Sequence, residues 1–419
     1  MPSWHNKLFF NTLLTLLLYN ASIFLLEGKL MFYTHRISFV ASSLVAAFFL
    51  LGCGDTSSDT PTTATTTIDG QLVDNYVENA SYTCADMLVR TTEKDGRFSC
   101  PSLPVTFSLG GLRLGSINAL PSDKQVFPQD LIGVNRDQTT NSDVVAMARL
   151  LQSCDSDTNL STGISIADAT ITNLETYDED FNASNLDSYI SDAEVILVDE
   201  ISAIEHLEET TNFIDAVNAV EKLPQNVRDA LLSAESVLST ELKNTLSYMQ
   251  NEERLAYDVY SELYKLFPTA NQLNNIAENS ESTHIETVEL LILKYISSDE
   301  EFSNLDNEGV NLETTVAGEY AISAITDLYN ALMAKGSASQ QDALEVGCMI
   351  EVTDINDLDH DIALAQESNA SDVVVAFEYL RNGSYNHYWA FDKGLKSMGV
   401  TQGCCVLDTE YCHPEYPSK

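Results

Sequence analysis

Apolar residues recur at helical spacing through the second half of the chain, from Leu186 almost to the C-terminus. This pattern predicts four long helices: Thr240–Phe267, Asn271–Tyr295, Ser337–Ala365 and Ser371–Met398. A shorter helix, Glu319–Lys335, is expected on the connection between the second and the third, with Gly336 as its C-cap. The C-terminal part of the chain is therefore expected to be all-α.

The chain before these helices changes its pattern twice. Two helices, Asn185–Glu208 and Asp215–Leu238, are predicted directly ahead of the long ones, and the second is expected to be broken at Pro224. From about Ile68 to Asn173 the apolar runs are short, alternate with polar residues and are broken by turn residues, which is typical of strands. One helix, Asp143–Gln152, is expected there. The pattern thus predicts a small β-rich module followed by a helical connector.

The N-terminal region has the pattern of an export signal. An uncharged apolar run, residues 37–51, follows Arg36 and ends at Leu50-Leu51-Gly52-Cys53. A run of fifteen uncharged residues is short for a membrane span of about twenty. The last four residues resemble a lipobox, which implies that the segment before Cys53 is removed and that Cys53 is lipidated. With Gly54 next to Cys53, such lipoproteins are expected in the cell envelope, anchored at the outer membrane.

The expected organisation is multidomain: a small β-rich N-terminal module followed by an all-α four-helix bundle. At 419 residues the chain is long enough for two or more cores. Four long helices with one long crossover are the connectivity of ferritin-like bundles. In chain order we expect an over-extended N-terminus or further membrane segment (1–30), a signal peptide (31–52), a tether (53–67), the β-rich module (68–173), a connector (174–237), the bundle (238–398) and a cysteine-containing tail (399–419).

The charge of the chain is strongly negative. Asp and Glu outnumber Lys and Arg by 63 to 21. Because such a surface repels phosphates, we expect no nucleic-acid partner. Small cations would be attracted, although most of this charge is expected only to keep the protein soluble.

Export would place the seven cysteines other than Cys53 in an oxidising compartment, where disulfides persist. Spacing alone does not fix the connectivity. At least one cysteine is expected to stay free, Cys154 or Cys348, and for Cys348 core filling is favoured over a ligand or redox role. The disulfide candidates fall into two groups: Cys84 and Cys100, which flank a hairpin-like stretch, and Cys404, Cys405 and Cys412 near the C-terminus.

The second long helix carries Glu281 and His284 three residues apart, so that both lie on one helix face. Di-metal carboxylate bundles use such Glu-x-x-His pairs together with Glu from other helices. Alone the pair is not specific, because the composition gives about one acidic-x-x-His triplet by chance. A second triplet, Asp357/His360, fails on geometry, since His360 lies about 180° around its helix from Glu351.

The neighbouring helices add groups at matching spacing. The first long helix has Glu253, Ala256 and Tyr260 at i, i+3 and i+7, and the third has Glu351 and Asp354 at i and i+3. The fourth carries Arg381-x-x-Ser384-x-Asn386-His387-x-x-Ala390-Phe391. Carboxylates buried together without a cation would repel each other, so their joint presence favours metal binding over solvated helix faces.

Residues from about 238 to 398 resemble a family of bacterial ferritin-like, rubrerythrin-related domains of unknown function (DUF2202-type). The resemblance covers some 160 residues, well under half of the chain. Its motifs are Glu252-Glu253-Arg254-Leu255-Ala256-x-Asp258-Val259-Tyr260, Asn275-Ile276-Ala277-x-x-x-Glu281-x-x-His284, Ala343-Leu344-x-Val346-Gly347-x-x-Ile350-Glu351-x-x-Asp354-Ile355-x-Asp357-Leu358 and the stretch from Ser384 to Phe391. The region before it resembles a β-rich module of exported lipoproteins with no established activity.

This resemblance implies a metal site of iron, as a di-iron centre, or manganese. Two departures matter. Ser384 stands where Glu is expected three residues before the last His, and Asp354 is one methylene shorter than the expected Glu. A mixed, mononuclear or weakly held second site would follow. The implied ligands are Glu253, Glu281, His284, Glu351 and His387, with Asp354 as a sixth, and Tyr260, Ser384 and Asn386 would lie next to them.

The function implied is that of an oxidoreductase acting on oxygen, peroxide or ferrous iron. The chain has no Cys-x-x-Cys pair, so any reductant would be external. The alternative is a non-enzymatic interaction lipoprotein of the envelope, in which the metal is structural or is absent and buried hydrogen bonds hold the helices. The expected partners are metal ions and, through the lipid anchor, the membrane; the oligomeric state is not predicted.

Asp155-x-Asp157-x-Asn159 with Gly163 has some features of a calcium loop. Leu160, however, stands where an EF-hand needs Gly for its sharp turn, and Ile166 stands where it needs a bidentate Glu. A solvated acidic turn is therefore expected here, and calcium is not.

Overall fold

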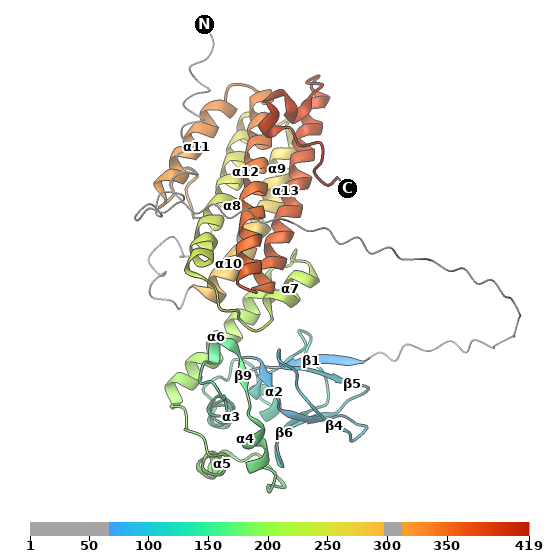
Figure 1. Ribbon diagram of the computed structural model, residues 1–419, viewed down its shortest axis with the longest axis vertical. Coiled ribbons are helices and arrows are strands. Elements are labelled where there is room, and N and C mark those ends of the chain that lie inside the picture. Colours follow the sequence, from blue (N-terminus) through green and yellow to red (C-terminus); the bar gives the residue numbers. More distant parts are fainter. Residues whose placement is uncertain (1–66, 297–311, 313, 419) are drawn as a thin grey trace, which may run out of the picture. The chain divides into compact units, whose positions relative to one another are not determined.

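The computed structural model describes residues 67–296, 312 and 314–418 (Figure 1). The predicted signal peptide, the lipidation site Cys53 and most of the tether lie outside these residues. Residues Thr67–Lys419 group into one unit, and the domain boundaries expected within it stay predictions. Within the described ranges, no helix combines the length and the apolar character that crossing a membrane requires.

The N-terminal region is rich in β-structure, as its pattern predicts. Its strands form a five-stranded sheet in the order β10-β7-β6-β3-β4, a three-stranded sheet β5-β1-β8 and the pair β2-β9. The strands are β1 (Ile68–Leu72), β2 (Val77–Glu78), β3 (Ser81–Thr83), β4 (Val89–Thr91), β5 (Arg97–Cys100), β6 (Val105–Leu109), β7 (Leu112–Ile117), β8 (Gln125–Val126), β9 (Ile164–Ser165) and β10 (Glu179–Asp180).

Alternation of buried and half-buried residues along β6 provides one face of the core of this region. Phe107 on β6 packs edge-to-face on Phe98 of β5, with ring centroids 5.1 Å apart, and Tyr82 of β3 packs against Phe98 at 5.8 Å. A disulfide joins Cys84 to Cys100, the pair that the sequence favours. The module is thus closed by aromatic packing and a covalent bridge.

Short helices complete the N-terminal region. The expected helix is present as α3 (Ser142–Ser153), and Asn141 caps it by accepting from the backbone N–H groups of Asp143 and Val144. The others are α2 (Pro128–Ile132), α4 (Asp168–Asn173) and α5 (Leu186–Ala193), with 3₁₀ turns at Leu160–Thr162 and Ala183–Asn185.

The two connector helices predicted from the sequence are wrong in their bounds. The predicted first helix is split, because Glu194 adopts a left-handed conformation after α5 and Asp199 caps a new helix, α6 (Glu200–Ala219). The second predicted helix is broken at Pro224, as expected: residues 215–219 belong to α6, and the part after the proline is α7 (Gln225–Leu231), which ends before Leu238. For the first helix, local turn and capping chemistry outweighed the apolar periodicity.

The C-terminal region is helical, and its long elements lie close to their predicted bounds (Figure 1). They pack through α8 on α10, α8 on α12, α10 on α13 and α12 on α13. Gly336 is the last residue of α11 rather than its cap, and it allows close packing on Leu263. The elements are α8 (Thr240–Leu266), α9 (Asn271–Ile276), a π-helical turn (Ala277–Glu281), α10 (Ser282–Tyr295), α11 (Ser323–Gly336), α12 (Gln340–Glu367) and α13 (Ser371–Ser397).

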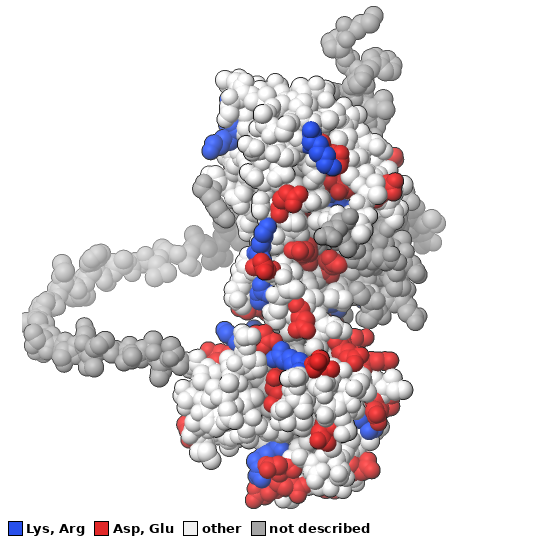
Figure 2. All heavy atoms as spheres, turned by 180° about the vertical axis from the view of Figure 1, so that it is seen from behind, with Lys and Arg blue, Asp and Glu red and all other residues white. Residues whose placement is uncertain are grey.

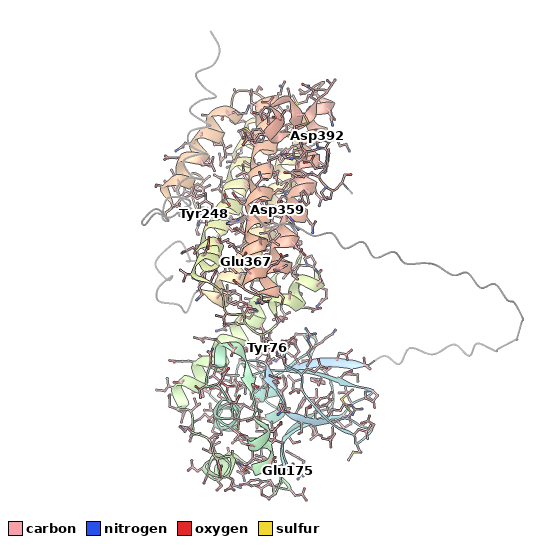
Figure 3. The ribbon with its side chains drawn as sticks, in the orientation of Figure 1. Tyr76, Glu175, Tyr248, Asp359, Glu367 and Asp392 are labelled. Atoms are coloured by element: carbon pink, nitrogen blue, oxygen red, sulfur yellow. A yellow bond between two sulfur atoms is a disulfide. The ribbon has the colours of Figure 1, made fainter. Side chains whose placement is uncertain are left out.

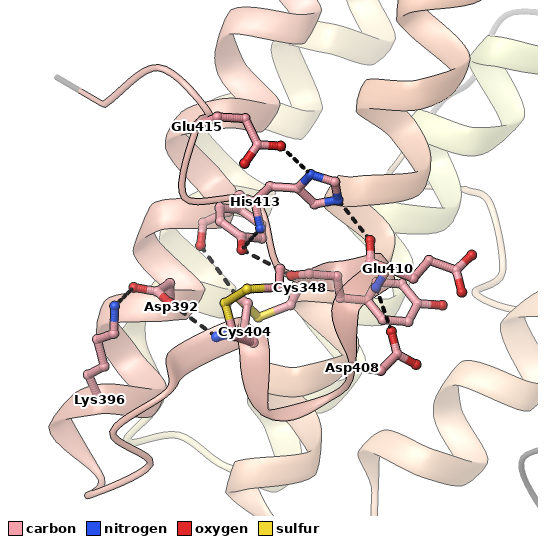
Figure 4. The surroundings of a disulfide bond; sticks show 12 residues. Cys348, Asp392, Lys396, Cys404, Asp408, Glu410, His413 and Glu415 are labelled. Atoms are coloured by element: carbon pink, nitrogen blue, oxygen red, sulfur yellow. Dashed lines mark hydrogen bonds and ion pairs between the residues drawn. A yellow bond between two sulfur atoms is a disulfide. The ribbon is translucent and has the colours of Figure 1, made fainter.

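The C-terminal tail contains two 3₁₀ turns, Gly403–Val406 and Thr409–Tyr411, and is fixed to the helices by a disulfide between Cys404 and Cys348 of α12 (Figure 4). Asp392 of α13 supports it by accepting from the backbone N–H of Cys404 at 3.1 Å. The prediction that Cys348 fills the core as a free thiol is therefore wrong, because the tail folds back to pair with it.

Two further cysteines of the tail, Cys405 and Cys412, form a disulfide with each other. Cys154 is the free cysteine of the described residues, and it is buried. The second bridge expected among the tail cysteines is present, and the tail supplies a third through Cys404. All three disulfides are compatible with an oxidising compartment.

Acidic side chains are scattered over the face seen in Figure 2, with Lys and Arg fewer among them. They do not gather there into one large patch.

Candidate metal centre

Four helical segments bring the predicted ligands together in the interior of the C-terminal region. Glu253 comes from α8, Glu281 and His284 from the π-helical turn and the start of α10, Glu351 from α12, and His387 from α13. All five residues are buried, with at most 5% of each exposed. Charged groups are rarely buried so fully unless they are paired or bind a metal.

The ligands form two sets that share one carboxylate. In the first set, His284 Nδ1 lies 3.2 Å from Glu253 Oε2 and 3.0 Å from Glu281 Oε2. In the second, His387 Nδ1 lies 3.1 Å from Glu281 Oε1 and 3.2 Å from Glu351 Oε2. The ligand atoms of each set lie within 4.8 Å of one another. Glu281 therefore directs one oxygen to each set.

A π-helical turn, Ala277–Glu281, positions Glu281 and its neighbour Ser280. Such turns insert one residue into a helix and are frequent at functional sites. Ser280 Oγ lies 2.7 Å from His387 Nε2 and 3.4 Å from His284 Nε2. One hydroxyl thus sits behind both imidazoles, on the side opposite the carboxylates, and fixes the ring orientation that points each Nδ1 at the ligand set. The apolar pattern of the sequence gave no signal for Ser280.

Gly383 of α13 makes room for His284. A Cβ at this position would lie 2.4 Å from His284 Nε2 and 2.5 Å from His284 Cε1. Any larger residue would therefore collide with the imidazole. Tyr379, one turn earlier on α13, packs edge-on against the same ring with centroids 5.6 Å apart. Neither residue was recognised from the sequence.

Tyr260 lies where the resemblance implies, beside the second ligand set. Its hydroxyl donates to Glu351 Oε1 at 2.5 Å, and its ring packs on Phe391 with centroids 5.1 Å apart. Burial, and then the charge of Glu351, raises the pKa of Tyr260 above its usual range. The phenol thus stays protonated and holds Glu351 in place.

Asp354 and Ser384 lie together at the edge of the site. Ser384 Oγ donates to Asp354 Oδ2 at 2.5 Å, and the same hydroxyl lies 3.1 Å from the carbonyl oxygen of Leu380. Burial raises the pKa of Asp354 well above its usual range, and the charges of Glu253 and Glu351 add to the shift. The carboxylate of Asp354 therefore lies close enough to both ligand sets for their charges to raise its pKa.

Asn386 does not join the ligands. Its side-chain amide donates to the carbonyl oxygen of Asn382, on its own helix, at 2.6 Å. The position next to His387 in sequence lies about 100° away around the helix, which turns Asn386 from the site. His360 is exposed, as its helical position predicts.

Protons on the histidines balance the buried carboxylates. Burial opposes the charge of His387, but Glu281 and Glu351 outweigh it and raise its pKa to about 10. The pKa of His284 is likewise raised, by Glu253 and Glu281, against its burial. Burial alone would raise the pKa of Glu281, yet His387 and His284 hold it below its usual range. Bound cations would take over this role and displace the protons.

Glu253 retains an open ligand atom. Its Oε1 is buried and has no hydrogen-bond partner in the part of the chain that the structure describes. Burial raises the pKa of Glu253 to about 7, with His284 opposing the shift. Leaving a buried carboxylate oxygen unpartnered is costly, and this oxygen is available to bind a cation.

Comparisons with known proteins cover the same region. A family described as "Uncharacterized protein domain (DUF2202)" matches residues 242–410, which include all six predicted ligands. The uncharacterized protein MJ0754 of Methanocaldococcus jannaschii is 36% identical over 162 residues, 39% of this chain and 79% of that protein. The crystal structure of hypothetical protein MJ0754 from Methanococcus jannaschii covers 39% of this chain and 85% of that chain, with 34% identity and a TM-score of 0.34.

Proposed function

The chain belongs to the DUF2202 family, and we propose that its family domain is a ferritin-like four-helix bundle that binds a pair of iron or manganese ions. The observation that carries this proposal is the position of Glu281, which directs Oε2 to His284 and Oε1 to His387. A carboxylate shared between two similar ligand sets is what a pair of ions requires. Each set offers one imidazole nitrogen and oxygens from two carboxylates, the donors of di-iron and di-manganese bundles.

The charges of the site fit two divalent ions. Glu253, Glu281, Glu351 and Asp354 carry four negative charges when ionised, and two neutral imidazoles add none. Two divalent cations would balance these charges, which the buried site otherwise balances by protonating its histidines. The fit of the donor set to the cations supports the proposal.

Asp354 would compensate in part for the missing carboxylate at Ser384. The hydroxyl of Ser384 on α13 donates to Asp354 on α12. The carboxylate of Asp354 therefore lies next to the position where the family is expected to have a Glu on α13. We expect Asp354 to bind on the same side as the absent Glu, and to hold its ion less tightly because its oxygen also accepts from Ser384.

Bound iron or manganese would supply the electron transfer to oxygen or peroxide that the side chains cannot perform. The side chains hold and orient the ions: Tyr260 fixes Glu351, and Ser280 fixes both imidazoles. Six of the cysteines are paired in disulfides. An oxidoreductase of this kind would therefore take its electrons from an external reductant or from ferrous iron itself.

We further propose that the protein is an exported lipoprotein anchored through Cys53 in the cell envelope. The three disulfides support export, since such bonds persist in oxidising compartments. Metal and reductant would then be met outside the cytoplasm.

Metal analysis tests the proposed function. The chain is purified without chelators beside a Glu281→Ala/His284→Ala variant, and iron and manganese are counted per chain. Glu410→Ala/His413→Ala is a matched control, because it removes another Glu-x-x-His pair that lies in the C-terminal tail. We expect about two ions in the parent and the control and none in the first variant. Equal metal content in all three proteins would reject the site.

A second function rests on the absence of Glu at position 384. If the ions only stabilise the packing of the helices, the protein is an interaction lipoprotein of the envelope rather than an enzyme. Oxygen and peroxide consumption with a supplied reductant separates the two functions. Turnover that disappears in the Glu281→Ala/His284→Ala variant supports the enzyme, and full metal content without turnover supports the structural role.

A further inference from the structure

A second site with unsatisfied ligand chemistry lies in the turn between α3 and β9, in the β-rich region and away from the metal centre in sequence. Asp155 follows the end of α3 and is only 6% exposed. Its Oδ1 accepts from the backbone N–H of Ser165 at 3.0 Å. Its Oδ2 is buried without a hydrogen-bond partner among the described residues. A buried carboxylate oxygen left unpartnered costs free energy unless a cation or a proton meets it.

A second carboxylate, that of Asp157, lies beside Asp155 in the same turn. Burial raises the pKa of Asp155 above its usual value, the Ser165 N–H opposes the shift, and the side chain of Asp157, within hydrogen-bond reach, raises it further. Two carboxylates that approach this closely repel each other unless a positive charge lies between them. The pair is thus arranged as the charged part of a cation site.

Side chains with neutral oxygens lie in the same turn. Ser161 Oγ donates to Asn159 Oδ1 at 2.9 Å, and Thr162 Oγ1 lies 3.5 Å from Asp157 Oδ2. Calcium accepts six to eight oxygen ligands in flexible geometry, taken from carboxylates, amide and backbone carbonyls, and water. An exposed turn of this composition can provide them without a fixed cage.

We propose that Asp155 and Asp157 bind a calcium ion in this turn, with neutral oxygens of residues 159–162 and water completing its coordination. The sequence favoured a solvated turn because Leu160 and Ile166 occupy two positions that an EF-hand needs. Ile166 is indeed in the core, 2% exposed, so it supplies no ligand. The structure adds that Asp155 is buried, that its Oδ2 has no hydrogen-bond partner among the described residues, and that Asp157 is its neighbour.

The expected affinity is modest. Two carboxylates are fewer than an EF-hand supplies, and no bidentate Glu is available at position 166. The dissociation constant should lie at about 10⁻⁴–10⁻³ M, the range of extracellular calcium modules. A site of this affinity would be filled where calcium is abundant, outside the cell, and would be independent of the metal centre.

Calorimetric titration of the purified full chain with calcium tests this site, after chelator treatment and in about 0.15 M salt to screen the acidic surface. Asp155→Asn keeps the acceptor for Ser165 but removes the charge. Glu175→Gln is the matched control, an exposed acidic residue of the same region (Figure 3). We expect one site in the parent and the control, and at least tenfold weaker binding in Asp155→Asn. Equal binding by all three proteins, or none by the parent, would overturn the proposal.

Thermal melting gives a second readout that also checks folding. In chelator, Asp155→Asn should melt at or above the parent, because it removes the repulsion from Asp157 and keeps the hydrogen bond. At 10 mM calcium the parent and Glu175→Gln should gain several degrees and Asp155→Asn should not. The Glu281→Ala/His284→Ala variant should still gain, which separates this site from the metal centre. A calcium shift shared by Asp155→Asn would refute the assignment.

Discussion

Replacing Gly383 by Ala adds one methyl group to α13 directly against His284, one of the proposed metal ligands. The new Cβ would lie 2.4 Å from His284 Nε2, whereas ordinary contact begins at 3.4 Å, so the imidazole must move by about 1 Å. Metal–ligand distances tolerate only about 0.2 Å. His284 would therefore leave its ligand set, while His387 and Glu351 would keep theirs.

The same change should leave the fold largely intact. Overpacking a buried position costs about 1–3 kcal/mol, and Ala gains about 1 kcal/mol over Gly within a helix. The net loss of unfolding free energy should thus lie between about zero and 2 kcal/mol. Loss of metal without loss of fold is the signature that a ligand has been displaced.

Metal counting and chemical denaturation measure the two effects on one preparation. Gly394→Ala is the matched control on the same helix, since its Cβ would meet the flexible end of Gln272, which can move aside. We expect about one ion per chain in Gly383→Ala and two in Gly394→Ala. Two ions in Gly383→Ala would refute the assignment of His284 as a ligand.

Further predictions address the support of the site, its charge, the tail and the anchor. Ser280→Ala should weaken metal binding by about 10–100-fold in a metal titration, as loss of an orienting hydrogen bond does. It should also lower the unfolding free energy of the metal-free chain by about 1–3 kcal/mol, because His387 Nε2 loses its partner. Glu253 and His387 bind protons more tightly in the folded state, since their pKa values are raised to about 7 and about 10. The metal-free chain should therefore lose stability as the pH rises above about 4.5, first through the pKa of Glu253 and then through that of His387. Melting curves in chelator measure this loss, and bound metal should abolish it. Cys404→Ser should lower the unfolding free energy by about 2–4 kcal/mol, and equal denaturant midpoints for variant and parent would contradict this. Cys53→Ser should abolish incorporation of radiolabelled fatty acid, and labelling that persists would exclude lipidation at this residue.

The long helices were predictable because their apolar positions repeat over many turns. The bounds of α8 and α13 differ from the expected ones by a single residue at their C-terminal ends. The connector helices were not predictable from periodicity, since Glu194 and Asp199 end one helix and begin another within a continuous helical pattern. Helix caps and left-handed turns depend on single residues, and the spacing of apolar positions carries no information about them.

The ligand set was predictable in part for a similar reason. Glu281 and His284 carry a spacing that has chemical meaning, whereas Ser280 and Gly383 act only through the way the chain folds. The π-helical turn places Ser280 beside Nε2 of both imidazoles. Gly383 is required because α13 passes so close to His284 that a Cβ would collide with its ring. The pairing of Cys348 likewise depends on the path of the tail, which no spacing reveals.

Anomalous X-ray diffraction from crystals of the chain purified without chelators, recorded at the iron and manganese absorption edges, tests the central claim most directly. The account predicts two peaks, one beside His284 and one beside His387, with the carboxylate of Glu281 between them. A single peak away from these residues, or no peak at either edge with the side chains ordered, would contradict it.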